Sequence, residues 1–307
     1  MPMQAYLNGQ FIAADQLHIA VHDAGFVMGA TVAEQLRTFA GKLFRLEEHL
    51  DRFERSLAIV GFDLPVGRDE LAAAAEHLVS TNHSQLATGD DLGLCLFATP
   101  GPYAAMAASA SAGPTLAMHT YPIAFGVFRD KFTQGQRLVA SSVPQIDGAS
   151  LPRELKCRSR MHYYLADREA ASAEGGARAL MLDADGCVLE ATTANVLIYH
   201  ESEGLISPPA ERILPGISVA ALLEIAANLG TAHTHRFLSL EDAAGADEVM
   251  LTSTSVCALP VISIDGRAIG NGRPGPLYQQ LLAGWNAMTG VDIAAQAAQF
   301  AERQVPA

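Results

Sequence analysis

A long stretch without charged side chains constrains the N-terminal half of the chain. No Asp, Glu, Lys or Arg occurs from Leu92 to Phe128. Such a run could form a membrane-spanning helix, but it is interrupted by prolines at positions 100, 102, 114 and 122. Proline removes a backbone N–H and clashes with the preceding turn, so one continuous spanning helix is excluded. We predict a buried strand, an Ala/Ser/Gly-rich loop and a second buried strand.

Composition limits the kinds of partner. The 307 residues are half hydrophobic, which is enough for a substantial core and predicts two domains. With 20 basic and 33 acidic residues the net charge is −13, which argues against binding to nucleic acid or an anionic membrane. Small molecules are the expected partners.

The N-terminus and the cysteines indicate the compartment. The first residues contain no basic region followed by an apolar run, so we expect no secretion signal and a cytoplasmic protein. None of the four cysteines forms a Cys-x-x-Cys pair, which predicts reduced thiols and no metal site.

Hydrophobic periodicity predicts both helices and strands along the chain. In the N-terminal part it predicts a hairpin over 5–13, a strand over 29–39, and helices over 46–60 and 69–81. In the C-terminal part it predicts helices over 158–174, 217–229 and 276–288, a hairpin over 179–189 with its turn at 183–186, and strands over 194–199, 247–254 and 261–264. The pattern weakens over 123–136, which we predict to link an N-terminal domain, 1–122, to a C-terminal domain, 137–307.

Two residues suggest the chemistry. Lys156 follows an extended, proline-containing segment, and Glu190 ends the hydrophobic strand that contains Val188 and Leu189. Pyridoxal phosphate uses such a pair, because an amine holds its aldehyde and a carboxylate keeps its ring nitrogen protonated. Taken singly, Lys156 could be a solvated surface lysine and Glu190 an exposed acid at a strand end.

Three places could bind the oxygens of a phosphate. Ile217 and Ser218 begin a helix, whose free N–H groups and dipole attract anions, although Ser218 could be an ordinary cap. The hydroxyls and amides of 252–255 could also bind an anion, or form a plain turn. Arg52 could bind phosphate through two parallel hydrogen bonds or pair with Glu48 one turn earlier.

In this order the motifs resemble those of class IV aminotransferases. These fold-type IV pyridoxal-phosphate enzymes include branched-chain and D-amino-acid aminotransferases and aminodeoxychorismate lyase. The likeness spans nearly the whole chain and rests on Glu34-x-x-Arg37, Glu48-His-Leu-Asp-Arg52, Lys156, Glu190-Ala-x-x-Ala-Asn195, Leu214-Pro-Gly-Ile217, Thr252-Ser-Thr254 and Asp265-Gly266.

The resemblance implies roles for these residues. Lys156 would form the Schiff base and shuttle the proton, and Glu190 would pair with the pyridine nitrogen. The remaining cofactor-binding residues would be Arg52, Asn195, Ile217, Ser218 and Thr254, while Ser255 and Val256 would offer backbone N–H groups to the substrate. The implied fold has a small N-terminal α+β domain and a larger C-terminal domain with a barrel-like sheet. The cofactor would lie between them, and a homodimer is expected.

The chain departs from the family pattern on the substrate side. Related aminotransferases often bind the substrate carboxylate with the arginine of a Thr-Arg-Gly strand end, where this chain has Thr99-Pro100-Gly101. Arg158 and Arg160 are the candidate replacements by proximity to Lys156. A tyrosine that some members place five residues after the lysine is Met161 here, and Tyr163 or Tyr164 could substitute.

We therefore hypothesise transfer of an amino group from an amino acid or amine to a 2-keto acid. One alternative keeps the cofactor but releases pyruvate, as in aminodeoxychorismate lyase. Another is a non-catalytic member that only binds a ligand or a partner protein. The presence of both Lys156 and Glu190 favours catalysis, because binding alone needs no electron sink.

Overall fold

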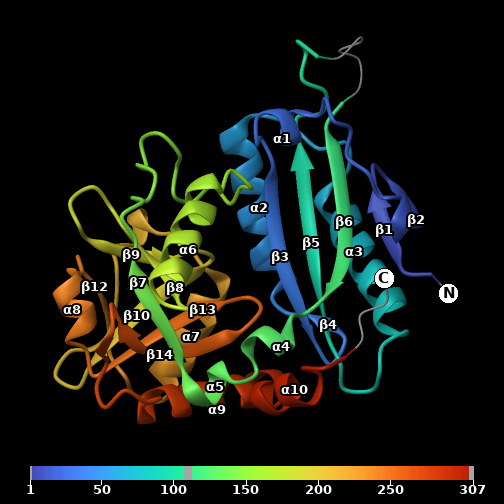
Figure 1. Cartoon of the computed structure of the whole chain (residues 1–307). Coiled ribbons are helices and arrows are strands. Elements are labelled where there is room, and N and C mark those ends of the chain that lie inside the picture. The colour runs from blue at the N-terminus through green and yellow to red at the C-terminus, as the bar shows by residue number, and fades with distance from the viewer. Residues whose placement is uncertain (1, 107–112, 304–307) are drawn as a thin grey trace. The chain divides into compact units, whose positions relative to one another are not determined.

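The computed structural model describes residues 2–106 and 113–303, which divide into two compact units (Figure 1). Unit 1 contains residues up to Ile123 together with Glu154–Ser159, and unit 2 contains Ala124–Arg153 and the chain from Arg160. The predicted linker, 123–136, carries two short helices, α4 (Phe125–Phe128) and α5 (Lys131–Gln134), and belongs to unit 2 from Ala124 onward. Residues 154–159 belong to unit 1 rather than to the predicted domain 137–307, because they pair with a strand of unit 1.

Unit 1 is built on a six-stranded antiparallel sheet in the order β2-β1-β6-β5-β3-β4. The strands are β1 (Gln4–Leu7), β2 (Gln10–Ala13), β3 (Val32–Phe39), β4 (Lys42–Leu43), β5 (Leu92–Thr99) and β6 (Thr115–Pro122). The uncharged run supplies β5 and β6, which pair along their whole length, so the prediction of two buried strands is confirmed. Part of the predicted loop between them, 107–112, lies outside the described residues.

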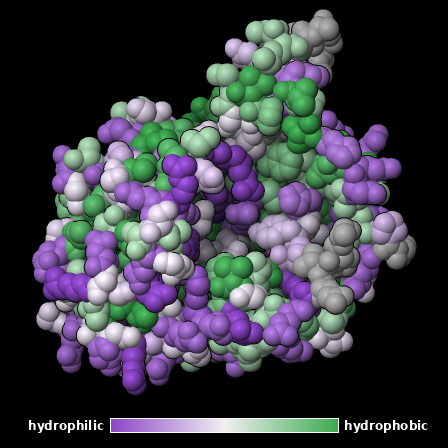
Figure 2. Space-filling view, in the orientation of Figure 1, coloured by the Kyte–Doolittle hydropathy of each residue, from purple (hydrophilic) through white to green (hydrophobic). Residues whose placement is uncertain are grey.

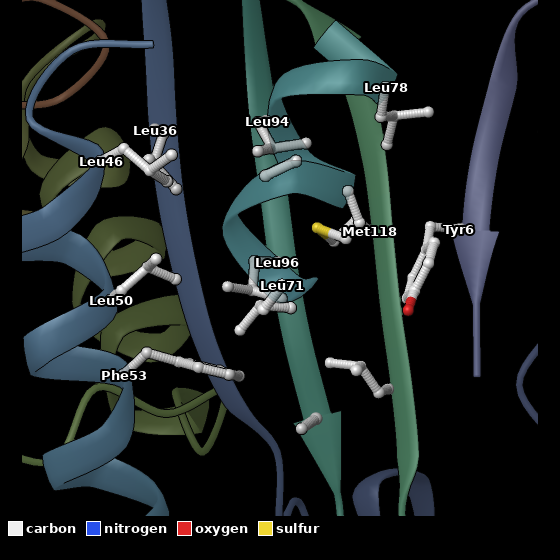
Figure 3. Packing of buried hydrophobic residues seen from close by; sticks show 14 of the residues in the cluster. Tyr6, Leu36, Leu46, Leu50, Phe53, Leu71, Leu78, Leu94, Leu96 and Met118 are labelled. Carbon is white, nitrogen blue, oxygen red and sulfur yellow. The ribbon is translucent and has the colours of Figure 1, made fainter. Parts of the chain in front are cut away.

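Two helices cover one face of this sheet, α2 (Leu46–Val60) over β3 and α3 (Arg68–His83) over β1, β5 and β6. Both confirm predicted helices. Figure 3 shows the buried side chains of α2 and α3 directed at those of the strands. The apolar stripe of α2 consists of Leu46, Leu50, Phe53 and Leu57. Gly61, with φ of 83°, ends α2 in the left-handed conformation that glycine adopts without strain.

Unit 2 contains a closed ring of strands. They are β7 (Gln136–Ala140), β8 (Arg178–Leu182), β9 (Val188–Ala191), β10 (Ala194–His200), β13 (Glu248–Ser253) and β14 (Cys257–Ile264). The order β10-β13-β14-β7-β8-β9 returns to its start because β9 pairs with both β8 and β10. Closure leaves no unpaired edge within the ring, and it confirms the predicted barrel-like sheet. β11 (Gly204–Ser207) and β12 (His233–His235) extend the sheet beyond β10, and β15 (Arg267–Ala268) pairs with β14.

Helices pack around this ring. They are α6 (Met161–Ala173), α7 (Ile217–Asn228), α8 (Leu240–Ala244), α9 (Pro276–Thr289) and α10 (Ile293–Gln299). α7 and α9 approach so closely that a Cβ at Gly284 would lie 2.2 Å from Cγ2 of Ile225. The three helices predicted in this part are confirmed as α6, α7 and α9, while α10 was not predicted. The α+β fold class is thereby confirmed. No helix in the described part of the chain is long and apolar enough to cross a membrane.

Candidate active site

Lys156 is held by its backbone against unit 1. The Ala33 amide donates to the Lys156 carbonyl at 3.0 Å, and the Arg158 amide donates to the Thr31 carbonyl at 2.9 Å. Between these bonds Cys157 pairs with Val32, so residues 156–158 run as an extended segment along the edge of β3. The Lys156 amide also donates to Oγ of Ser56 in α2, at 3.2 Å. Strand pairing and a helix hydroxyl therefore fix the position of this lysine, which is half-buried.

A buried ion-pair cluster lies near the Lys156 charge. Arg52 donates from Nε and Nη2 to the two carboxylate oxygens of Glu34, both at 2.7 Å, and His49 Nδ1 lies 2.7 Å from Glu34 Oε2. Burial opposes ionisation of Glu34, but the charge and hydrogen bonds of Arg52 lower the pKa of Glu34 from 4.5 to about 2, and the Lys156 charge contributes. Burial lowers the pKa of His49, although Glu34 opposes this. Glu34, in β3, is therefore bound by Arg52 through two parallel hydrogen bonds.

Glu190 is the penultimate residue of β9, in unit 2. Its side chain is buried, and its Oε1 accepts hydrogen bonds from the Tyr163 hydroxyl at 2.7 Å and from Gln145 Nε2 at 2.6 Å. Burial raises the pKa of Glu190, and these hydrogen bonds offset part of that effect. Glu190 forms no ion pair with any described residue. It is thus a buried carboxylate that has no ion pair among the described residues, although the charge of Arg153 also lowers its pKa, and it is not an exposed acid at a strand end.

Tyr163 and Gln145 complete this arrangement. Met161, at the position where some relatives have tyrosine, is 70% exposed, and Tyr164 is also exposed. Tyr163 lies one helical turn from Arg160 at the start of α6 and reaches Glu190, while Gln145 Nε2 also donates to the Tyr163 hydroxyl at 2.9 Å. The sequence predicted that either Tyr163 or Tyr164 would replace the tyrosine that some relatives have at the position of Met161. Sequence reasoning missed Gln145, which no motif marks.

Asn195 connects Glu190 to the start of α7. Asn195 pairs with Glu190 across β9 and β10, and with Thr252 across β10 and β13, so the three residues form a row. Its Nδ2 donates to the Leu214 carbonyl at 3.0 Å, just before Gly216 begins α7. A Cβ on Gly216 would lie 2.2 Å from Asn195 Oδ1, so a larger residue here would displace the Asn195 side chain.

The start of α7 can bind an anion. Gly216 is the N-cap and supplies no side-chain hydrogen bond, so the first N–H groups of this helix have no side-chain cap. Ser218 lies inside the first turn and is buried, which excludes the simple capping interpretation. Ile217 and Ser218 thus occupy the position that an anion-binding role requires.

The turn between β13 and β14 lies beyond Thr252 in the same row of strands. The Thr252 hydroxyl donates to the Cys257 carbonyl at 2.6 Å, and Cys257 has φ of 62°, an unusual value for a residue with a side chain. This closes a tight turn in which Thr254 and Ser255 are partly exposed and Val256 is buried.

The other candidate substrate residues belong to different elements. Thr99 is buried, and its hydroxyl donates to Asp23 Oδ2 at 2.9 Å and accepts from the Gly101 amide at 3.1 Å. Arg158 extends from the segment beside β3 to Cys95 in β5. Arg160 belongs to unit 2, where it is the N-cap of α6.

Unit 2 thus contains a buried carboxylate and a helix start that can bind an anion, and unit 1 contains an amine whose backbone is fixed. An amine can hold an aldehyde covalently, a buried acid can hold a cationic ring nitrogen, and a helix start can hold a phosphate. No group of three or more metal-ligating side chains that could hold a metal ion occurs among residues 2–106 and 113–303.

Known proteins share this sequence pattern and fold. The family model for class IV amino-transferases matches residues 31–264. A D-alanine aminotransferase of Bacillus licheniformis is 30% identical over 281 residues, which cover 91% of this chain and 94% of that protein. The branched-chain aminotransferase of the archaeon Thermoproteus uzoniensis, solved with norvaline, superposes with a TM-score of 0.81 at 25% identity, covering 94% of this chain and 95% of that one. Another solved branched-chain amino acid aminotransferase, complexed with N-(5'-phosphopyridoxyl)-L-glutamate, superposes with a TM-score of 0.83 at the same identity and coverage.

Replacing Glu34 with glutamine tests the buried ion pair. Arg52 would keep its charge without a counter-charge, which typically costs about 3–5 kcal/mol. Because the pKa of Glu34 is depressed to about 2, its stabilisation is complete above pH 4.5 and is lost as the pH falls toward 2. Urea unfolding of Glu34→Gln between these values should therefore depend less on pH than that of the wild type. Glu54→Gln, on the exposed face of α2, is the control. If both variants lost the same free energy of unfolding, the prediction would be contradicted.

Replacing Gly216 with alanine tests the start of α7. The added methyl overlaps Asn195, and such overpacking costs about 1–3 kcal/mol. We expect affinity for pyridoxal phosphate to fall by about five- to hundredfold, measured by titrating the apoprotein and following absorbance. Gly67→Ala is the matched control, because Gly67 also caps a helix and has nothing within 4 Å of an added Cβ. Equal affinity of the two variants would refute the role of Gly216.

Proposed function

The chain belongs to the class IV aminotransferase family, and on that premise we propose that it transfers an amino group between an amino acid and a 2-keto acid through Lys156. Its cofactor is pyridoxal phosphate, and a similar branched-chain aminotransferase was solved with a phosphopyridoxyl ligand. The observation that carries the proposal for this chain is the buried carboxylate of Glu190.

The residues fit this cofactor. A buried carboxylate without an ion-pair partner among the described residues costs free energy unless a cation reaches it, and a protonated ring nitrogen supplies that cation. The uncapped start of α7 suits the phosphate. When bound, pyridoxal phosphate supplies an aldehyde that takes an amine and a ring that accepts the electron pair left when a Cα proton departs.

Lys156 has two roles in the proposal. Its amine would hold the aldehyde of the bound cofactor, and once a donor amine had taken its place, the freed amine would accept and return the proton of the substrate Cα. Both roles require that the amine keeps a fixed position relative to the cofactor. The hydrogen bonds of residues 156–158 to Thr31, Ala33 and Ser56 support this, because they fix the backbone from which the amine extends.

Glu190 keeps the ring nitrogen protonated. Tyr163 and Gln145 donate to the same oxygen, Oε1, and so hold the carboxylate in one orientation. Both hydrogen bonds favour the ionised form, against the effect of burial, so the acid retains the charge that attracts a cationic nitrogen.

Ile217, Ser218 and Thr254 would hold the phosphate, and Asn195 would support them by fixing the segment before α7. We include Arg52 in this group, oriented by its two hydrogen bonds to Glu34. On the substrate side, Ser255 and Val256 would offer backbone N–H groups. The Thr99 hydroxyl is already engaged by Asp23 and Gly101, so we propose that Thr99 shapes this strand end.

Reductive trapping tests the role of Lys156. The purified protein is incubated with pyridoxal phosphate, treated with borohydride and digested, and the modified peptide is identified by mass spectrometry. We expect the cofactor on Lys156, and we expect Lys156→Ala to lose about 10²- to 10⁴-fold or more in the rate at which amino acids convert the bound cofactor to its aminated form. Lys42→Ala, at an exposed lysine in β4, is the control.

The same assay separates the alternatives. Failure of every amino donor to aminate the wild-type cofactor would refute the aminotransferase proposal. Pyruvate released without any keto acid acceptor would favour a lyase. Cofactor trapped at another lysine would refute the role of Lys156.

We also propose that the enzyme is a homodimer. Val21, Phe26, Met28 and Met106 are all more than 60% exposed. Backbone bonds from Ala24 to Gly101 and from Tyr103 to His22 bring their two segments together. Figure 2 shows hydrophobic side chains on the described residues next to the ends of β5 and β6 at the top of the view. Exposed apolar groups of this kind mark surfaces that bind other proteins, and a second copy of the chain is the proposed partner.

Light scattering tests the dimer. We expect a mass of twice 32.4 kDa for the wild type and a shift toward the monomer for Phe26→Asp, because a buried unpaired charge opposes association. Val127→Asp, at an exposed apolar residue of unit 2, is the control and should stay dimeric. A monomeric wild type would refute the proposal.

A further inference from the structure

A second polar cluster lies on the sheet of unit 1, away from the helices. Cys95 in β5 pairs with Gln35 in β3 on one side and with His119 in β6 on the other. Their sequence neighbours Leu94, Leu96 and Met118 belong to the core beneath α2 and α3. Because side chains alternate along a strand, Cys95 and His119 lie on the opposite face of the sheet. This face presents polar groups that neither the core nor the residues assigned above explain.

Arg158 joins this cluster from the segment beside β3. Its Nη2 donates to Sγ of Cys95 at 3.0 Å. A hydrogen bond with Cys95 raises the pKa of His119, while the nearby charge of Arg158 opposes that rise. The His119 ring also contacts Phe97 and Tyr121, with centroids 6.5 and 6.1 Å away. We call Cys95, His119 and Arg158 the sheet-face cluster.

The sheet-face cluster gathers two basic side chains and no carboxylate. Burial opposes ionisation of the Cys95 thiol, but the hydrogen bonds and charges of His119 and Arg158 lower its pKa. A guanidinium has five N–H donors, and the only hydrogen bond from the Arg158 guanidinium to a described residue goes to Cys95. Neither Arg158 nor His119 forms an ion pair within the described part of the chain. Two like charges side by side repel each other, and an anion that reaches both would remove this cost.

Lys156 and Arg158 point the same way from their backbone. The bonds of this segment to Thr31 and Ala33 show that it is extended, so residues two apart lie on the same side and about 6.6 Å apart along the segment. Cys157 lies on the other side, with Val32. An amino or keto acid carries its reacting carbon next to its carboxylate, so the two ends of such a molecule match a reacting amine and a cation at this spacing.

We propose that Arg158, assisted by His119, binds the carboxylate of the substrate, so that amino acids rather than simple amines are the donors. This rests on the proposed function, because it places the carboxylate relative to a reacting Lys156. Cys95 is a positioning residue, since its sulfur orients the guanidinium. In this proposal Arg158 replaces the carboxylate-binding arginine that related enzymes have at the position of Pro100. Arg158 is preferred to Arg160, which belongs to unit 2.

Binding of an unreactive acid tests the site without chemistry. The holoenzyme is titrated by calorimetry with 4-methylvalerate and, separately, with its uncharged amide, 4-methylvaleramide. The wild type should prefer the acid. Arg158→Gln should weaken acid binding by about ten- to hundredfold and leave amide binding unchanged, as expected for the loss of hydrogen bonds to a charged group. Arg158→Lys keeps the charge but not the forked geometry of the guanidinium. Its affinity for the acid should therefore lie between that of the wild type and that of Arg158→Gln.

Two further variants sharpen the test. His119→Gln should weaken acid binding less than Arg158→Gln does, while Arg55→Gln, at an exposed arginine of α2 in the same unit, should leave it unchanged. No preference for acid over amide in the wild type, or a loss below about threefold in Arg158→Gln, would overturn the proposal.

The two proposals can fail separately. If no donor aminates the cofactor but acid binding still depends on Arg158, the aminotransferase proposal fails and the carboxylate site stands. If donors aminate the cofactor but Arg158→Gln converts amino acids and simple amines in the wild-type ratio, the carboxylate site fails and the transferase stands.

Discussion

The backbone pairing of residues 156–158 with the edge of β3 is the constraint on which the arrangement of functional groups depends. Residues 124–153 and the chain from Arg160 onward belong to unit 2. The segment 154–159 between them therefore leaves unit 2, joins unit 1 and returns. Hydrogen bonds to Thr31, Ala33 and Ser56 hold them there, and Ser159 adds one from its hydroxyl to the Gly29 carbonyl at 2.8 Å. The lysine therefore takes its position from the rigid sheet of unit 1, and Arg158, two residues on, takes the same side.

Two buried glutamates show how local environment sets the charge of one residue type. Glu34 shares its unit with Arg52, whose charge overcomes the effect of burial and holds the pKa of the acid near 2. Burial raises the pKa of Glu190, which has hydrogen bonds but no ion pair among the described residues. The charge of the first carboxylate, Glu34, is balanced within unit 1 by Arg52, and Glu34 orients that arginine. The second is stable as an anion only with hydrogen-bond donors and an incoming cation, which is the property a cofactor-binding acid needs.

Local patterns predicted most of the elements and few of the contacts. The stripe of α2, the Asn8-Gly9 hairpin and the uncharged strands β5 and β6 follow from periodicity and turn chemistry, which neighbouring residues determine. The closure of the barrel through β9 and β10, the bond from Gln145 to Glu190 and the pairing of Arg52 with Glu34 join residues distant in sequence, so no local signal marks them. The membership of Lys156 in unit 1 was missed for the same reason, since three residues of extended chain look alike whichever sheet they join.

The strand end at Thr99 explains why a carboxylate would be bound elsewhere on this sheet. Asp23 is buried there and accepts hydrogen bonds from the Thr99 and Thr115 hydroxyls and from the Gly25 amide. Pro100 adds neither a positive charge nor an N–H donor beside this acid. A substrate carboxylate near Asp23 would meet a negative charge, whereas one near Cys95, along the same strand, would meet Arg158 and His119. The charge distribution along β5 thus favours recognition at the middle of the strand, on the side toward which Lys156 and Arg158 extend.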